Sequence, residues 1–113
     1  METRRMEKIN RLIQKDLSEL LREKSKDEFF SCMITVTRVD VTSDLSYARV
    51  YVSIFELKYK KEDILQVLKE KKDLIRMWLA QRERHQLRII PDIAFFIDDT
   101  LDYAQRIEEL LKK

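Results

Sequence analysis

The stretch of sequence that decides the fold lies between residues 38 and 55. It reads Arg38-Val39-Asp40-Val41-Thr42-Ser43-Asp44-Leu45-Ser46-Tyr47-Ala48-Arg49-Val50-Tyr51-Val52-Ser53-Ile54-Phe55. Two runs rich in β-branched and aromatic residues flank a short polar connection, which is the pattern of two strands joined by a turn. Extending both runs predicts an antiparallel hairpin, with strands over residues 32–42 and 47–56.

The second of these strands has two chemically different faces, because side chains alternate along a strand. The apolar face is formed by Ala48, Val50, Val52 and Ile54. The other face is formed by Tyr47, Arg49, Tyr51 and Ser53. Tyrosines beside an arginine can stack on unpaired bases, or they can pack beneath a loop or a helix. The residues alone are compatible with either arrangement.

Helical periodicity appears on both sides of the hairpin. Residues 4–24 predict an amphipathic helix whose apolar stripe contains Met6, Ile9, Leu12, Ile13, Leu17, Leu20 and Leu21. Residues 61–86 are also helical in period, but the stripe is interrupted by the charged run 69–73. A straight helix would place Lys71 on its buried side. Either the Lys71 side chain reaches out to solvent, or the helix bends there and divides into two.

A third strand is predicted over Ile93–Ile97, and Pro91 just before it indicates either an edge position in the sheet or a ladder position that faces away from the neighbouring strand. Asp98, Asp99 and Thr100 then precede a last helix, where helix capping explains the aspartates. The apolar stripe of that helix contains Leu101, Ala104, Ile107, Leu110 and Leu111. We therefore predict a single α+β domain over residues 1–113, in which helices cover one face of a three-stranded sheet.

Composition excludes several classes of site. The chain contains no glycine, which excludes a P-loop, a glycine-rich dinucleotide turn and the Gly-x-x-Gly loop of ordinary KH domains. Cys32 and His85 are the only residues of their types, so an internal disulfide is impossible and a tetrahedral zinc site is disfavoured. We expect Cys32 to be buried, and we expect no cofactor and no metal. Without an apolar span or leader, a cytoplasmic protein is expected.

Charge is unevenly distributed along the chain. Net charge is +2, yet residues 58–88 carry ten basic and five acidic side chains, and residues 89–113 carry three basic and six acidic ones. Such a basic segment attracts polyanions, or it forms an ordinary solvated helix surface. On a helical wheel Lys69, Lys72 and Arg76 share one face. A second basic cluster is offset by nearby acidic residues and is interpreted as solvent-facing, with some RNA contact; it comprises Arg4, Arg5, Lys8, Arg11 and Lys15.

Three separated motifs resemble the ribosome-binding factor A family, the bacterial assembly factors of the small ribosomal subunit. They are Val39–Val52, Ile75-Arg76 and Leu87–Leu101. The resemblance implies a type II KH-like fold with the order α-β-β-α-α-β plus a C-terminal helix and without a Gly-x-x-Gly loop. One departure concerns the Ala-x-Gly element that kinks the helical region in this family, because Lys71, Lys72 and Asp73 stand at those positions.

The resemblance also implies a function. The chain is expected to bind the free 30S subunit as a monomer and to assist late maturation of 16S rRNA, without catalytic residues. The expected phosphate contacts are Lys69, Lys71, Lys72, Arg76, Arg82, Arg84 and Arg88. Two other classes are a protein-interaction module with an apolar groove and a small hydrolase using Asp98, Asp99 and His85. The hydrolase is disfavoured because the sequence contains no nucleophile motif.

Overall fold

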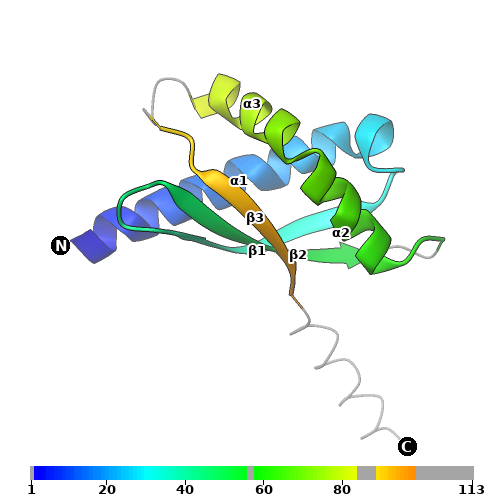
Figure 1. Ribbon diagram of the computed structural model, residues 1–113, viewed down its shortest axis with the longest axis horizontal. Coiled ribbons are helices and arrows are strands. Elements are labelled where there is room, and N and C mark those ends of the chain that lie inside the picture. The colour runs from blue at the N-terminus through cyan, green and yellow to red at the C-terminus, as the bar shows by residue number, and fades with distance from the viewer. Residues whose placement is uncertain (1, 56–57, 84–88, 99–113) are drawn as a thin grey trace, which may run out of the picture.

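Helices and strands follow one another in the predicted order. The computed structural model describes residues 2–55, 58–83 and 89–98. The elements are α1 (Glu2–Glu28), β1 (Met33–Val41), β2 (Tyr47–Phe55), α2 (Lys61–Glu70), α3 (Lys72–Glu83) and β3 (Asp92–Ile97) (Figure 1). This order confirms the type II KH-like prediction. The predicted C-terminal helix lies outside the described residues.

The three strands form one sheet with β2 in the centre. β1 and β2 are antiparallel, which confirms the predicted hairpin, and Val39 lies opposite Val50. β3 runs parallel to β2, and Val50 also lies beside Phe95. β3 therefore occupies an edge of the described sheet, which agrees with the first of the two positions that Pro91 indicated.

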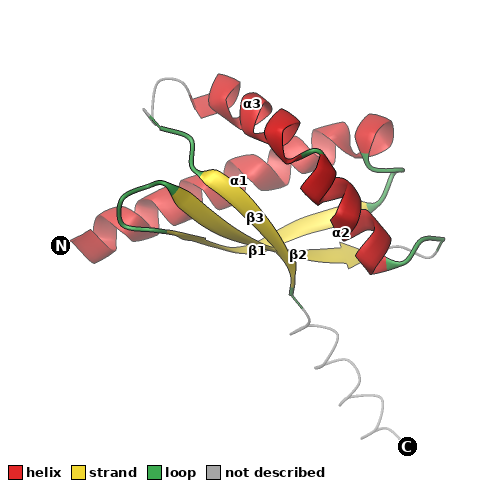
Figure 2. Cartoon of the chain, viewed as in Figure 1, coloured by secondary structure: helices red, strands yellow, loops and turns green. Residues whose placement is uncertain are grey.

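All three described helices pack on the same face of this sheet (Figure 2). Burial of apolar side chains drives this packing. The strands contribute Ile34, Val36, Val39, Ala48, Val50, Val52, Ile54, Ile93 and Phe95 to the core. The helices contribute Ile13, Leu17, Leu21, Ile64, Leu68, Ile75 and Leu79. The predicted apolar face of β2 is thus confirmed, and its other face points away from the helices.

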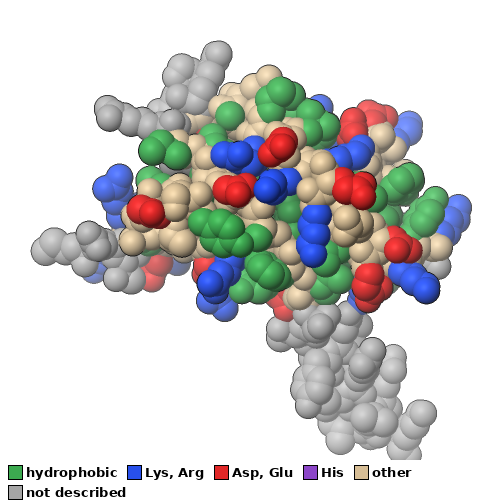
Figure 3. All heavy atoms as spheres, viewed as in Figure 1, with side chains coloured by type: hydrophobic (Ala, Val, Ile, Leu, Met, Phe, Trp, Pro, Cys, Tyr) green, Lys and Arg blue, Asp and Glu red, His purple; other side chains and the backbone are tan. Residues whose placement is uncertain are grey.

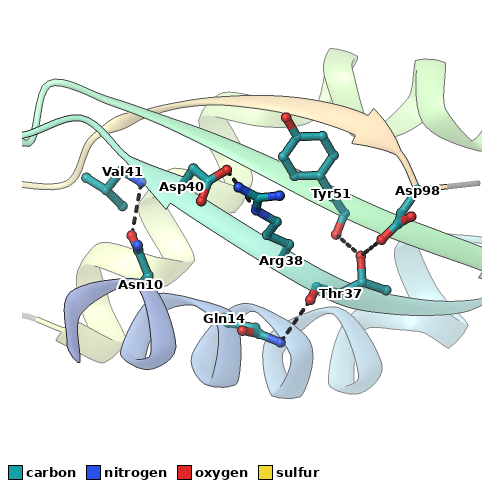
Figure 4. Close-up of polar contacts among 8 residues, drawn as sticks. All are labelled: Asn10, Gln14, Thr37, Arg38, Asp40, Val41, Tyr51 and Asp98. Carbon is teal, nitrogen blue, oxygen red and sulfur yellow. Dashed lines mark hydrogen bonds and ion pairs between the residues drawn. The ribbon is translucent and has the colours of Figure 1, made fainter. Parts of the chain in front are cut away.

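Polar side chains fix α1 against β1 (Figure 4). The ladder between β1 and β2 is irregular between Val36 and Arg38, and a bulge of this kind leaves backbone groups without ladder partners. The side-chain amide of Gln14 lies 3.3 Å from the carbonyl oxygens of both Val36 and Thr37. Nearer the end of β1, the N–H of Val41 donates to Oδ1 of Asn10 over 3.0 Å. These bonds set the position of α1 along the strand.

The helical region divides at Lys71. This confirms the second of the two predicted alternatives, in which the helix divides into two instead of continuing straight with the Lys71 side chain reaching out to solvent. α2 ends at Glu70, and Lys71 has φ −94° and ψ 13°. The Lys71 N–H still bonds to Val67 O at 3.0 Å, and its carbonyl accepts from the Ile75 N–H at 2.9 Å. Both sides of the break therefore keep their hydrogen bonds. The chain changes direction here without a glycine.

α1 is longer than predicted and ends in a strained turn. It reaches Glu28 rather than residue 24 because Phe29, which is fully buried, extends its contact with the core. Phe30 and Ser31 have φ values of 56° and 61°, the left-handed region where glycine is usual at a helix end. The Ser31 N–H closes the turn on Ser25 O at 2.9 Å. Each such non-glycine residue costs about 1–2 kcal/mol.

The hairpin turn is organised by Asp44. Its Oδ1 accepts hydrogen bonds from the hydroxyl of Thr42 at 2.7 Å and from the hydroxyl and N–H of Ser46 at 2.7 and 3.1 Å. These bonds, from Thr42 first and Ser46 second, lower the pKa of Asp44 to about 2. The charged carboxylate is the better acceptor, so the turn is held most firmly when Asp44 is ionised.

We expect Asp44→Asn to remove this pH dependence. The pKa of Asp44 in the unfolded chain is about 3.9, above its folded value. The ionised Asp44 side chain therefore stabilises the fold above a pH of about 4, and this contribution is lost as the pH falls towards about 2. Urea unfolding at several pH values should show a difference between the wild type and Asp44→Asn that is largest at neutral pH and narrows on acidification. A difference that stays constant with pH would contradict this assignment.

Candidate nucleic-acid interface

Two of the predicted RNA contacts bind the segment that leads into β3. The ammonium group of Lys72 lies 3.3 Å from Oδ1 of Asp92, and this contact is the main reason why the pKa of Asp92 is lowered. Arg76 donates through Nε to Pro91 O at 3.1 Å and through Nη2 to Ile90 O at 3.0 Å. Both side chains thus join the first two turns of α3 to the start of the third strand.

Two others bind α1. Lys71, at the helix break, forms an ion pair with Glu28 at the end of α1, and its ammonium group lies 5.9 Å from the centre of the Phe29 ring. Arg82, near the end of α3, contacts Glu19 at 3.3 Å and Glu23 at 2.7 Å. Burial raises the pKa of Asp16 beside this group, although the charge of Arg82 opposes the rise. Both basic residues therefore neutralise acidic residues of the first helix.

The predicted basic face is therefore divided. Lys69 is exposed on α2, whereas Lys71, Lys72, Arg76 and Arg82 all have partners within the chain. Arg84 and Arg88 lie outside the described residues. Figure 3 shows the consequence, because basic and acidic side chains alternate across the visible face. Contact between these side chains and RNA stays a prediction.

The sheet face opposite the helices carries aromatic rings beside a cation. The rings of Tyr51 and Phe96 lie 5.5 Å apart between centroids, at an interplanar angle of 30°. The guanidinium carbon of Arg38 lies 5.8 Å from the Tyr51 ring, and Nε of Arg38 lies 2.9 Å from Asp40 (Figure 4). Phe96 is 41% exposed and Arg49 is also exposed. Aromatic rings flanked by arginines suit stacking on unpaired bases.

Sequence reasoning identified Tyr51 but missed two of its neighbours. Arg38 reaches Tyr51 because the ladder irregularity brings these two residues opposite each other. Phe96 lies beside Tyr51 because β3 pairs in parallel with β2 and these two residues are partners in the register. The alternation of Ala94 and Phe96 with the buried Ile93 and Phe95 is a signal that could have placed Phe96 on this face. The register itself could not be read from the sequence.

A separate group of exposed apolar side chains lies at one end of the sheet. Phe30 and Tyr59 are 54% and 44% exposed, and their ring centroids are 5.2 Å apart. Met33 and Phe55, which are cross-strand partners, are each 66% exposed. This group was not predicted, because the two loops that bring Phe30 and Tyr59 together have no periodic pattern.

The remaining candidate residues are Cys32, Asp98, Asp99 and His85, and the two that the structure describes have structural contacts. Cys32 is fully buried, as predicted. Oδ2 of Asp98 lies 2.6 Å from the hydroxyl of Thr37 (Figure 4), so this carboxylate fastens the end of β3 to the bulge in β1. Asp99 and His85 lie outside the described residues. Within the described residues, no three potential metal ligands lie together, and no helix is long and apolar enough to cross a membrane.

We expect Arg76→Ala to destabilise the fold. The substitution removes two hydrogen bonds from a charged donor to half-buried carbonyl groups, so the free energy of unfolding should fall by about 1.5–3 kcal/mol. Lys69→Ala is the matched control, since this exposed side chain should change stability by less than about 0.5 kcal/mol. Urea denaturation measures both. Equal stabilities for the two variants would show that Arg76 does not hold the segment before β3.

Comparison with known proteins gives a consistent assignment. The family model described as ribosome-binding factor A matches residues 5–111. A ribosome-binding factor A from Flavobacterium johnsoniae is 47% identical over 112 residues, which cover 98% of this chain and 85% of that protein.

Solved structures agree with the fold. The crystal structure of ribosome-binding factor A from Thermus thermophilus has a TM-score of 0.67 at 23% identity, with 81% of this chain and 94% of that chain covered. A model of the Thermus thermophilus factor, fitted into a cryo-electron microscopy map of its complex with the 30S subunit, has a TM-score of 0.63 at 25% identity. It covers 78% of this chain and 89% of that chain. The extent of the family match and the shared KH-like architecture establish that this chain belongs to the ribosome-binding factor A family.

Proposed function

We propose that this protein binds the free 30S ribosomal subunit and assists the late maturation of 16S rRNA by binding RNA, without catalysing a reaction. The observation that carries the proposal is family membership over nearly the whole chain, together with a similar fold in a protein described in complex with the 30S subunit. We further propose that it acts in the cytoplasm as a monomer. No cofactor is required for this activity.

Basic side chains of α2 and α3 are part of the proposal. Lys69 is available to a phosphate directly. Lys71, Lys72, Arg76 and Arg82 would contact RNA while holding their partners in the chain. This double role is chemically feasible for Arg76, because a guanidinium group has five N–H donors and the carbonyls of Ile90 and Pro91 use only two. Arg84 and Arg88 also belong to the proposed set of phosphate contacts, and they are included from the sequence alone.

Phosphate contacts of this kind supply affinity but little sequence preference. The aromatic face around Tyr51 and Phe96 provides a complementary contact, because stacking on an unpaired base contributes about 1–3 kcal/mol. Recognition would then depend on where a suitably shaped RNA helix lies next to an unpaired strand, because proteins recognise duplex RNA mostly by its shape and unpaired bases by stacking.

Co-sedimentation with purified ribosomal particles tests the proposal. We expect binding to free 30S subunits, weaker binding to 50S subunits and assembled ribosomes, and an affinity that falls steeply as salt rises, because bound counterions are released from the phosphates. Equal binding to all three particles at every salt concentration would leave the fold intact and contradict the function.

Lys69→Glu tests the α2 contact without disturbing the fold. If Lys69 binds a phosphate, the variant should bind 30S subunits more weakly and the slope of log affinity against log salt should fall by about 1. Glu62→Gln changes the charge at another exposed position of α2 and serves as the control. This variant should not reduce the slope. An unchanged slope for Lys69→Glu would exclude this residue from the interface.

A further inference from the structure

The outward surface of α1 carries a row of basic side chains. Six basic side chains lie on one side of this helix, within about 60° of its circumference. The row consists of Arg4, Lys8, Arg11, Lys15, Arg22 and Lys26. All six side chains are exposed. From the first to the last the row is about 33 Å long, at 1.5 Å per residue. We call it the α1 basic row.

The orientation of the row is fixed by packing. Ile13, Leu17 and Leu21 are fully buried on the opposite side of the helix, so α1 cannot rotate without exposing its core residues. The bonds from Asn10 and Gln14 to β1 hold the helix in the same orientation. The row therefore points permanently away from the sheet.

The charge of the row is not neutralised within the described part of the chain. None of its six members forms an ion pair, a side-chain hydrogen bond or a ring contact there. Acidic residues of the same helix lie outside the row, and three of them are occupied elsewhere. Glu19 and Glu23 bind Arg82, and Glu28 binds Lys71. Pairing with α3 and the helix break thus draws negative charge away from the row.

We infer that the α1 basic row binds the phosphate backbone of double-helical RNA. This inference rests on the proposed binding to the 30S subunit and names the contact. A straight line of long, exposed cations matches a polyanion of similar length. α1 contains no aromatic residue, so the row cannot stack on unpaired bases as the Tyr51 face can. A contact made by phosphates alone suits a regular duplex, which proteins recognise by shape.

The test removes three central charges while preserving the helix. In the row variant, Lys8, Arg11 and Lys15 are all replaced by Gln, which is a good helix former. The control variant replaces Lys58, Lys60 and Lys61 by Gln; these residues lie outside α1 and outside the proposed set of RNA contacts, and the net charge falls equally. Circular dichroism and thermal unfolding should show that both variants fold like the wild type. Binding is then measured to 30S subunits, to deproteinised 16S rRNA, to a 16-base-pair RNA duplex and to single-stranded poly(U), each across a salt series.

We expect the row variant to lose affinity for the subunits, the deproteinised rRNA and the duplex. Each duplex phosphate contact contributes about 0.9 to the salt slope, so the slope on the duplex should fall by about 2.7. The control variant should keep most of the wild-type slope, and poly(U) binding should change less than duplex binding.

Three results would overturn the inference. Equal losses for the row and control variants would mean that only net charge matters. A loss on subunits with unchanged binding to deproteinised rRNA would place a ribosomal protein against the row. Unchanged binding to subunits would exclude the row from the interface while leaving the proposed function in place. By contrast, failure of the wild-type protein to bind 30S subunits would contradict the proposed function itself.

Discussion

The burial of the apolar stripe of α1 against the sheet is the interaction on which the rest of the structure depends. Ile13, Leu17 and Leu21 are fully buried, and removing such side chains from water typically contributes about 1.5–3 kcal/mol each. Once this stripe is buried, the rotation of α1 is fixed. Its polar residues are then divided into those that meet β1, those that meet α3 and those that face solvent. The positions of acidic and basic groups follow from that division.

Ion pairs between distant segments redistribute charge across the molecule. Glu19 and Arg82 are 63 residues apart in the sequence, yet their side chains lie within 3.3 Å. Partly exposed ion pairs of this kind contribute little to stability, typically below about 1 kcal/mol. Their greater effect is on the electrostatic surface. Acidic groups of α1 are neutralised by α3 and Lys71, so the solvent side of α1 is more basic than the composition of the helix suggests.

The absence of glycine has a visible structural cost. Phe30, Ser31 and Leu45 adopt positive φ values at turns where glycine would be free of strain. The helix break at Lys71 likewise occurs without the Ala-x-Gly element that the family resemblance led us to expect. Here packing on both sides imposes the break: Leu68 in α2 and Ile75 in α3 are both fully buried. A continuous straight helix would bring Lys71 onto the line between them. Tertiary contacts can therefore replace a local sequence signal for a bend.

The sequence by itself determined the order of the described strands and helical regions, the hairpin and the apolar faces, because alternation along a strand and periodicity along a helix are local properties of the chain. It left open whether the helical region divides at Lys71. It also identified Tyr51 and the basic residues as candidates for RNA contact. Only the tertiary structure decided which charges are neutralised. Lys72 and Arg76 meet the start of β3, and Arg82 meets α1, because segments far apart in the chain pack together. The neighbours of Tyr51 depend on strand register in the same way, and register is a property of the assembled sheet.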